Sequence, residues 1–337
     1  MTGPVDRRGR GVADLRLSVT DRCNLRCTYC MPRELFGANH QFLPRNEILS
    51  YEEFARLVEI FAGLGVSKVR LTGGEPLLRP EIETLISAIA GTSGIDDIAM
   101  TTNGALLAGR AGSLREAGLS RVTVSLDSVD PATFAAMADT KVPLSTVLDG
   151  IAAAADAGFG PIKLNAVVQR GVNDDGIVEL AKYARDGGHV LRFIEYMDVG
   201  SSNGWTSSDV VPAAEIIARV NAVFPIRTLP PSRAGEVARR WGYEDGRGEI
   251  GVITSVSEPF CGDCTRARIT STGELFTCLF ASQGTDLREL LRSGATDEEL
   301  RAAITRVWVA RDDNYSEQRQ NLLPLEVRRA EMSYLGG

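Results

Sequence analysis

The chain has 337 residues, of which 44% are hydrophobic and 24% are charged, an ordinary composition for a folded globular protein. This length exceeds one compact core of usual size, but it fits a barrel with an extension. The net charge of −7 disfavours non-specific binding to nucleic acid or to an anionic membrane, so we expect no nucleic acid and no membrane as a partner.

The first ten residues carry no apolar stretch behind their charges, so they do not resemble a secretory signal. No apolar run approaches the roughly 20 residues that span a bilayer. We therefore expect a cytoplasmic protein whose thiols stay reduced, and the six cysteines need an explanation other than disulfides. Arginine supplies most of the positive charge, and its planar fork suits phosphate, although composition bias is the preferred explanation for most of these arginines.

Six short apolar runs recur along the first part of the chain, and each is followed by a helix-like stretch. Several are rich in Val, Ile, Leu and Thr, as parallel strands buried on both faces should be. The predicted strands cover residues 14–20, 68–72, 97–103, 121–126, 162–168 and 189–197.

The stretches between these runs carry helical signals. Ser50 and Glu53 have the spacing of a capping box, and apolar residues follow at helical intervals until Gly63 and Gly65. Further helices are predicted over residues 80–90, 144–157 and 177–184. The alternation predicts an α/β fold, a partial (β/α)6 barrel of the TIM type, because a complete barrel needs eight units.

The alternation stops after Met197. Residues 200–208 are polar and predict a loop, while residues 225–251 are rich in Pro, Gly and Arg and predict an irregular segment. Helices are predicted over 213–223, 286–292 and 297–311. We accordingly divide the chain into a barrel domain, residues 1–200, and a C-terminal extension, residues 201–337.

The cysteines form two groups of three. The first group follows the first predicted strand with C-x3-C-x2-C spacing, and the second lies near the C-terminus with C-x2-C-x13-C spacing. The groups are Cys23, Cys27 and Cys30, and Cys261, Cys264 and Cys278. Three closely spaced thiolates suit a metal ion or an iron–sulfur cluster.

Three ligands are an informative number. A structural zinc site normally has four, and His40 and His189 are the only histidines. A [4Fe–4S] cluster held by three cysteines leaves one iron free to bind a small molecule, so two such groups would bring two ligands together. Zinc or coincidence is the alternative for the first group. Zinc completed by an acid such as Asp263, or a purely structural cluster, is the alternative for the second.

Residues 23–32, with the sequence CNLRCTYCMP, resemble the signature loop of the radical S-adenosylmethionine superfamily. In that superfamily the open iron binds the methionine part of the cosubstrate, and one electron cleaves the sulfonium to give a 5′-deoxyadenosyl radical. Residues 72–76, TGGEP, resemble the glycine-rich motif that meets the amino group of the cosubstrate. Residues 101–104 and 125–127 end the next two predicted strands, where an ordinary polar loop is an equal alternative.

From Gly9 to the C-terminus the chain resembles the GTP 3′,8-cyclase family of molybdenum cofactor biosynthesis. The matching segments are residues 14–23, 192–200, 261–268 and the final Gly336-Gly337. The resemblance implies a lyase with two [4Fe–4S] clusters and S-adenosyl-L-methionine. Such an enzyme converts GTP to (8S)-3′,8-cyclo-7,8-dihydroguanosine 5′-triphosphate, the first step of molybdenum cofactor biosynthesis.

The same resemblance assigns site residues. It implies that the six cysteines hold the two clusters, and that Tyr29, Gly74, Ser125 and Met197 contact S-adenosylmethionine. It implies GTP contacts by Arg16, Arg70, Thr101, Lys163, Arg192, Arg266, Ala267 and Arg268. It gives catalytic roles to Arg266, Arg268, Gly336 and Gly337. Charged residues inside apolar strands are costly to bury without partners, which favours a pocket, although each alone could be ion-paired or could extend to solvent.

The resemblance also implies partners: a second copy in a homodimer, an external electron donor, and a cyclic pyranopterin monophosphate synthase that receives the product. Three other functions are alternatives. One is a radical enzyme that acts on a peptide, and another is a non-enzymatic iron–sulfur or zinc sensor, which would have little use for basic residues at strand ends. An arginine-rich nucleic-acid binder is disfavoured by the net charge.

Overall fold

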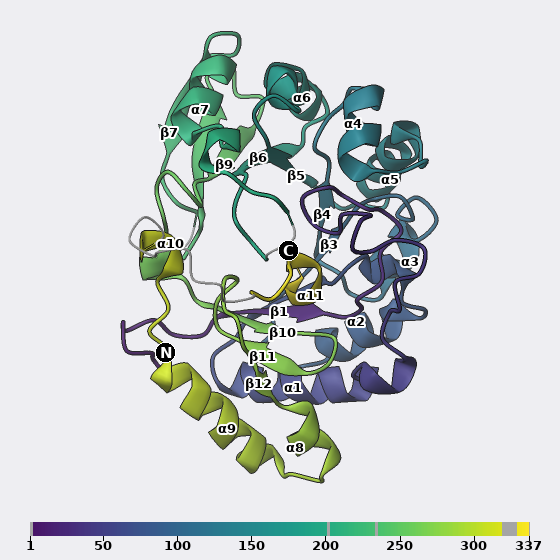
Figure 1. The fold of residues 1–337 in the computed structure, drawn as a ribbon, viewed down its shortest axis with the longest axis vertical. Helices are drawn as coiled ribbons and strands as arrows, with labels where there is room; N and C mark the ends of the chain where they lie inside the picture. The colour runs from purple at the N-terminus through teal and green to yellow at the C-terminus, as the bar shows by residue number, and fades with distance from the viewer. Residues whose placement is uncertain (1–2, 201–202, 233–234, 319–328, 337) are drawn as a thin grey trace.

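The computed structural model describes residues 3–200, 203–232, 235–318 and 329–336. Their strands form one sheet with the order β12-β11-β10-β1-β2-β3-β4-β5-β6-β9-β8-β7. The stretch from β10 to β9 is parallel throughout, and antiparallel strands extend it at both edges. The sheet curves into a partial barrel with helices on its outside (Figure 1).

All six predicted strands are confirmed, each with ends within two residues of those expected. They are β1 Asp14–Ser18, β2 Lys68–Thr72, β3 Asp97–Thr102, β4 Arg121–Ser125, β5 Lys163–Val168 and β6 Val190–Glu195. Their apolar side chains are buried because both faces are covered, one by helices and the other by the interior of the barrel.

The helices between these strands also match the periodicity. Ser50 and Glu53 form the predicted capping box, and the helix that follows buries Phe54, Leu57 and Phe61 against the sheet. The helices are α1 Tyr51–Gly63, α2 Ile82–Ala90, α3 Ala111–Glu116, α4 Pro131–Ala138, α5 Leu144–Asp156 and α6 Ile177–Asp186. Short 3-10 helices lie at Arg45–Glu47, Pro76–Leu78, Asp174–Gly176, Ser207–Asp209 and Cys261–Asp263.

The prediction of an irregular segment over residues 225–251 is wrong. The chain there forms β7 Ile226–Leu229, β8 Ala238–Tyr243 and the start of β9 Glu249–Ile253. These three strands lie at one end of the sheet. The strand β8 carries Arg239 and Arg240 among its apolar residues, so the sequence shows no continuous apolar run there. The strand β9 then pairs in parallel with β6 and extends the barrel beyond six strands.

The rest of the extension lies before β7 or after β9 in the chain. It contains β10 Arg266–Ile269, β11 Glu274–Phe276, β12 Thr285–Asp286, α7 Ala213–Asn221, α8 Arg288–Arg292, α9 Asp297–Ala310, α10 Tyr315–Gln318 and α11 Met332–Leu335. The strand β10 pairs in parallel with β1, so the extension flanks the barrel on both sides. None of the described helices is long and apolar enough to cross a lipid bilayer.

Candidate active site

A cavity of about 1520 Å³, measured with its open mouth, lies inside the partial barrel. We call it the chamber. Most of the expected site residues line it, namely Arg16, Tyr29, Arg70, Thr101, Arg192, Met197, Cys261, Cys264, Arg266, Arg268 and Cys278. Residues from the first cysteine loop and from the second cysteine group therefore face one space.

The chamber is strongly basic at the level of the central strands. Arg16 of β1 is paired with Arg268 of β10 on one side and with Arg70 of β2 on the other. Side chains at one register position point to the same face of a sheet, so three guanidinium groups gather on the interior wall. Burial, followed by the nearby Arg268 and Arg266, lowers the pKa of Arg16 well below its usual value.

Several buried polar atoms on this wall have no hydrogen-bond partner among the described residues. They include the Nε atoms of Arg16 and Arg70 and the Oδ1 atom of Asn165. Burial is also the main reason why the pKa of Arg70 and that of Arg268 fall to about 10. Several buried cations with unused hydrogen-bond donors indicate a site for a polyanion. Such a ligand would supply negative charge to balance the arginines and acceptor atoms for their free N–H groups.

Two charged residues of this wall were not predicted as site residues. Asp14 and Lys68 both line the chamber, and Lys68 Nζ lies 3.4 Å from Asp14 Oδ2. The two residues are paired across β1 and β2, two positions before the pair of Arg16 and Arg70. Asp14 is the acid among these bases; burial opposes its ionisation, but the charges of Lys68 and Arg16 outweigh burial and lower its pKa. The signal was present in the sequence, because these positions share the even-numbered alternation of Arg16 and Arg70.

Lys163 lies on β5, on the same face as Asn165, although it falls outside the residues that line the chamber. Burial, followed by the charges of Arg192 and Arg121, lowers its pKa to about 7. The amine of the free protein therefore loses its proton between pH 7 and 8, where a free lysine keeps it.

We expect GTP binding at pH 8 to take up about one proton. The negative triphosphate raises the pKa of Lys163, which is lowered to about 7 in the free chain, and the neutral amine then becomes protonated. Below pH 7 the amine is already charged, so GTP binding takes up no proton there. Above pH 7 the amine must gain a proton when GTP binds, so the affinity for GTP should fall as the pH rises. Titration calorimetry in two buffers of different ionisation enthalpy measures the proton count. Lys163→Met is the control, and an equal uptake by that variant would contradict the assignment.

The first cysteine group sits in the loop after β1, at the carboxyl end of the parallel strands. Backbone bonds from Arg26 to Ala138 and from Thr28 to Met137 hold this loop against α4. Burial, followed by Asp127, Cys30 and Cys23, raises the pKa of Cys27 well above its usual value. The thiols are thus close enough to oppose one another's ionisation, and a bound cationic centre would reverse that effect.

Tyr29 connects this loop to the end of β4. Its hydroxyl donates to Asp127 Oδ2 at 2.8 Å, and Asp127 Oδ1 accepts from the Val167 amide at 2.9 Å. Burial raises the pKa of Asp127 to about 6. Asp127 was noticed only as part of a strand end, and nothing in the sequence tied it to Tyr29, 98 residues away.

The glycine-rich segment after β2 packs directly against the first cysteine loop. A Cβ atom on Gly74 would lie 2.3 Å from the Arg22 carbonyl oxygen, so only glycine permits this contact. Glu75 is fully buried and accepts from Leu77 N, Thr102 Oγ1 and Asn103 N at 2.7 to 3.0 Å. Gly74 and Ser125 are both half-buried, and neither is among the residues that line the chamber.

The second cysteine group lies at the opposite end of the barrel. Cys264 comes just before β10, which runs parallel to β1, whereas Cys23 follows the other end of β1. Cys278 follows β11, which pairs with β10, and it lines the chamber together with Arg266. Burial, followed by Asp313, Cys264 and Cys261, raises the pKa of Cys278 to about 12. Burial also opposes ionisation of Cys264, but Arg266 and Arg311 outweigh it and the pKa is lowered.

In the part of the chain that the structure describes, no three His, Cys, Asp or Glu side chains are placed to hold one metal ion. Each group consists of soft thiol donors with unpaired sulfurs, the donor set that iron–sulfur clusters use. The residues present therefore fit a thiolate-held cluster at each group. The second group lines the chamber, whereas Cys23, Cys27 and Cys30 lie outside its lining and only Tyr29 of their loop lines it.

The C-terminal tail reaches Arg268 of β10. Arg268 Nη1 donates to the Gly336 carbonyl at 3.2 Å, and Leu335 is fully buried. Figure 1 places α11 inside the curve of the sheet. Gly337 lies outside the described residues. Ala267, between the two arginines of β10, packs its side chain into the hydrophobic core, so only its backbone can face the chamber.

Gly336→Ala should lower the rate of GTP turnover about tenfold or more with little change in thermal stability. Gly336 has a φ of +71°, and an added Cβ would lie 2.4 Å from Thr72 Cγ2, so the tail must shift and release Arg268. A hydrogen bond from a charged donor contributes about 1.5 to 3 kcal/mol. Gly94→Ala is the matched control, because Gly94 has a φ of +89° but open space around it. Normal turnover by Gly336→Ala would remove the tail from the site.

Comparisons with known proteins agree with this geometry. The sequence profile of the radical SAM superfamily matches residues 17–184, and that of Molybdenum Cofactor Synthesis C matches residues 189–317. Streptococcus suis SuiB, solved bound to precursor peptide SuiA, superposes with a TM-score of 0.61 at 16% identity, over 93% of this chain and 67% of that chain. That likeness supports the fold alone. Fold and profile together define a protein of the radical SAM superfamily.

Full-length relatives narrow the class further. A protein named GTP 3′,8-cyclase from Acidothermus cellulolyticus is 55% identical over 362 residues, and one from Xanthomonas axonopodis pv. citri is 48% identical over 338 residues. Both alignments cover 100% of each chain. The chain belongs to the GTP 3′,8-cyclase family, and the resemblance seen in its motifs is confirmed.

Proposed function

We propose that this chain is a radical S-adenosylmethionine enzyme that converts GTP to (8S)-3′,8-cyclo-7,8-dihydroguanosine 5′-triphosphate, in the first step of molybdenum cofactor biosynthesis. One observation carries the proposal: a single chamber reaches from Tyr29 and Met197, beside the first cysteine group, to the second cysteine group, with a wall of buried arginines between them. A nucleoside triphosphate matches this length and this charge.

Two [4Fe–4S] clusters and S-adenosylmethionine are the cofactors of this proposal. Cys23, Cys27 and Cys30 would hold the first cluster, and Cys261, Cys264 and Cys278 would hold the second. When bound, these groups supply the electrons and the 5′-deoxyadenosyl radical that attack on the ribose 3′ C–H bond requires. Tyr29, Gly74, Ser125 and Met197 would orient S-adenosylmethionine near the first group.

The remaining residues bind and orient GTP. Basic and polar side chains would hold the triphosphate and keep carbon 8 of the base close to the ribose, which favours ring closure over loss of the radical. These residues are Arg16, Arg70, Thr101, Lys163, Arg192 and the Arg266–Arg268 segment. Arg266 and Arg268, with the tail residues Gly336 and Gly337, would stabilise negative charge that develops as the ring closes and one electron and one proton are added.

The proposal extends to organisation and partners. Residues 1–200 would form the barrel domain and residues 201–337 the extension that carries the second cluster, a division near the point where the two matching profiles meet. A homodimer, a cytoplasmic location, an external electron donor and transfer of the product to a cyclic pyranopterin monophosphate synthase are further parts of this proposal. They rest on the family alone.

The decisive experiment is anaerobic reconstitution, with iron counting and incubation with S-adenosylmethionine, dithionite and GTP. We expect about eight irons per chain, 5′-deoxyadenosine that depends on GTP, and a cyclised nucleotide of the same mass as GTP. A non-enzymatic sensor would hold metal without cleaving the cosubstrate. Zinc at either cysteine group, or cleavage that responds to a peptide and not to GTP, would contradict the proposal.

A further inference from the structure

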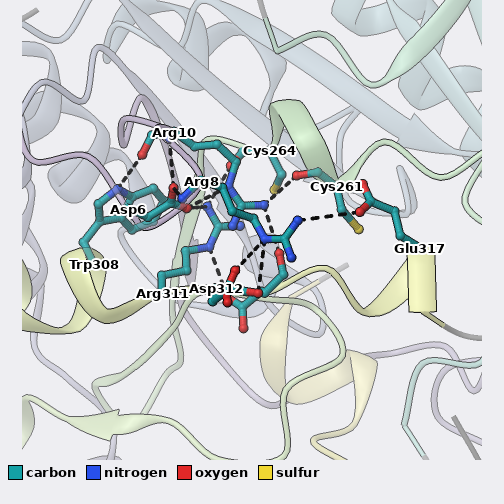
Figure 2. A network of polar contacts seen from close by, with 10 residues as sticks. Asp6, Arg8, Arg10, Cys261, Cys264, Trp308, Arg311, Asp312 and Glu317 are labelled. Carbon is teal, nitrogen blue, oxygen red and sulfur yellow. Dashed lines mark hydrogen bonds and ion pairs between the residues drawn. The ribbon is translucent and has the colours of Figure 1, made fainter.

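The N-terminal segment and the end of α9 meet behind the second cysteine group. Asp6 and Arg10 come from the segment before β1, and Arg311 ends α9, 305 positions after Asp6 (Figure 2). Asp6 Oδ2 accepts from Arg10 Nε at 2.7 Å and from Arg311 Nη1 at 3.3 Å. The side chains of all three are at most 3% exposed. We call these three residues the terminal clamp.

The clamp holds the backbone of two cysteines directly. Arg10 Nη1 donates to the Cys261 carbonyl at 2.6 Å, and Arg311 Nη1 donates to the Cys264 carbonyl at 2.7 Å. Both arginines also line the chamber. Arg10 uses Nε for the shared carboxylate and Nη1 for the Cys261 carbonyl, whereas Arg311 uses Nη1 for both the carboxylate and the Cys264 carbonyl and Nε for Asp313. A lysine ammonium has one nitrogen and cannot reproduce two donor atoms of a planar fork.

Trp308 fixes the clamp from the side of α9. Its Nε1 atom donates to the Arg10 carbonyl at 3.0 Å, and its ring lies 4.7 Å from the Arg311 guanidinium carbon. A backbone hydrogen bond from Arg7 N to Arg311 O, 3.1 Å long, is a further link between the N-terminal segment and the end of α9. The guanidinium groups have no freedom to turn away, so the carbonyls that they hold are fixed as well.

Such rigidity exceeds what the fold needs at this place. The second cysteine group lies in a loop and a short 3-10 helix, where backbone positions are not fixed by the sheet. Groups behind metal ligands commonly orient those ligands, and their loss costs about 10- to 100-fold in metal affinity or activity. Two buried cations with one buried anion also leave a net positive charge beside three thiolates, although the more exposed Asp313 offsets part of it.

We propose that Arg10 and Arg311, joined through Asp6, are positioning residues that hold Cys261 and Cys264 in the geometry for binding the second cluster. The inference rests on the proposed function, because it presupposes a cluster at this cysteine group. It adds a role for the segment before β1 and for the residue that follows α9. The radical chemistry itself does not require this role.

The test reads the second cluster alone. A parent variant with Cys23, Cys27 and Cys30 replaced by alanine keeps only the second group and should hold about four irons. In this parent, Arg10→Lys and Arg311→Lys keep the charge but lose the fork. We expect each to release iron to a chelator about tenfold faster and to change the electron paramagnetic resonance spectrum of the reduced cluster. Asp6→Asn should accelerate release less, because both arginines keep their hold on the carbonyls.

Arg8→Lys is the matched control. Arg8 lies in the same segment, and its Nε atom donates to Asp312 Oδ1 at 2.6 Å, a contact that involves no cysteine. Its iron release should stay within about twofold of the parent. In the chain with all six cysteines, the clamp variants should keep the four irons of the first group, which separates clamp loss from unfolding.

The outcomes distinguish the two proposals. A parent that binds no iron contradicts the second cluster, and the positioning role falls with it. A parent that binds about four irons, with clamp variants that release iron at the parent rate and keep its spectrum, contradicts the positioning role alone.

Discussion

Cys278→Ala is expected to abolish GTP cyclisation while the chain keeps about four irons and still cleaves S-adenosylmethionine. Cys278 faces the chamber from the end opposite the first cysteine loop, so its loss leaves the radical-forming end intact. A cluster with only two remaining thiolates, Cys261 and Cys264, is no longer held. Iron counting, 5′-deoxyadenosine formation and nucleotide analysis on one anaerobic sample measure the three effects.

Cys27→Ala is the mirror-image control. It should keep the second group's iron but form no 5′-deoxyadenosine, because Cys27 belongs to the loop at the other end of the barrel. The pair of variants therefore assigns one function to each end of the chamber. Full GTP turnover by Cys278→Ala would remove the second cluster from the reaction.

Strand and helix positions were readable from the sequence because parallel strands buried on both faces leave a continuous apolar signal. Residues 68–72 are buried at every position, and the prediction of this strand was correct at both ends. The strand β8 was missed because it lies near the edge of the sheet and carries polar side chains on its exposed face. A local pattern cannot reveal such a strand without its partners.

The candidate site was predictable where chemistry and spacing coincide in one segment. The cysteines and the arginines of β1, β2 and β10 were named from the sequence, and the structure brings the arginines to one wall. The terminal clamp was not predictable, because Asp6 and Arg311 are ordinary charged residues until the fold places them together. Asp14 and Lys68 could have been found by applying the strand alternation to every charged position.

Arg16→Met should raise the KM for GTP about 10- to 100-fold and raise the thermal midpoint of the free protein. Arg16 stands between Arg70 and Arg268 with its Nε atom unpartnered, and burial and these like charges lower its pKa. A buried cation whose pKa is lowered in the folded state weakens folding at neutral pH, where the unfolded chain solvates it freely. Methionine fills similar space without the charge, so folding gains what GTP binding loses.

The opposite sign of the two effects is what identifies a binding residue. Replacing a structural arginine by methionine would instead lower the stability of the protein. Arg110 provides that comparison, because it pairs with Glu83 at 2.6 Å and 2.9 Å outside the chamber. Arg110→Met should therefore lower the thermal midpoint slightly and leave the KM unchanged. If Arg16→Met instead lowered the midpoint and kept the KM, Arg16 would be a structural residue, and the buried basic wall would not be the triphosphate site.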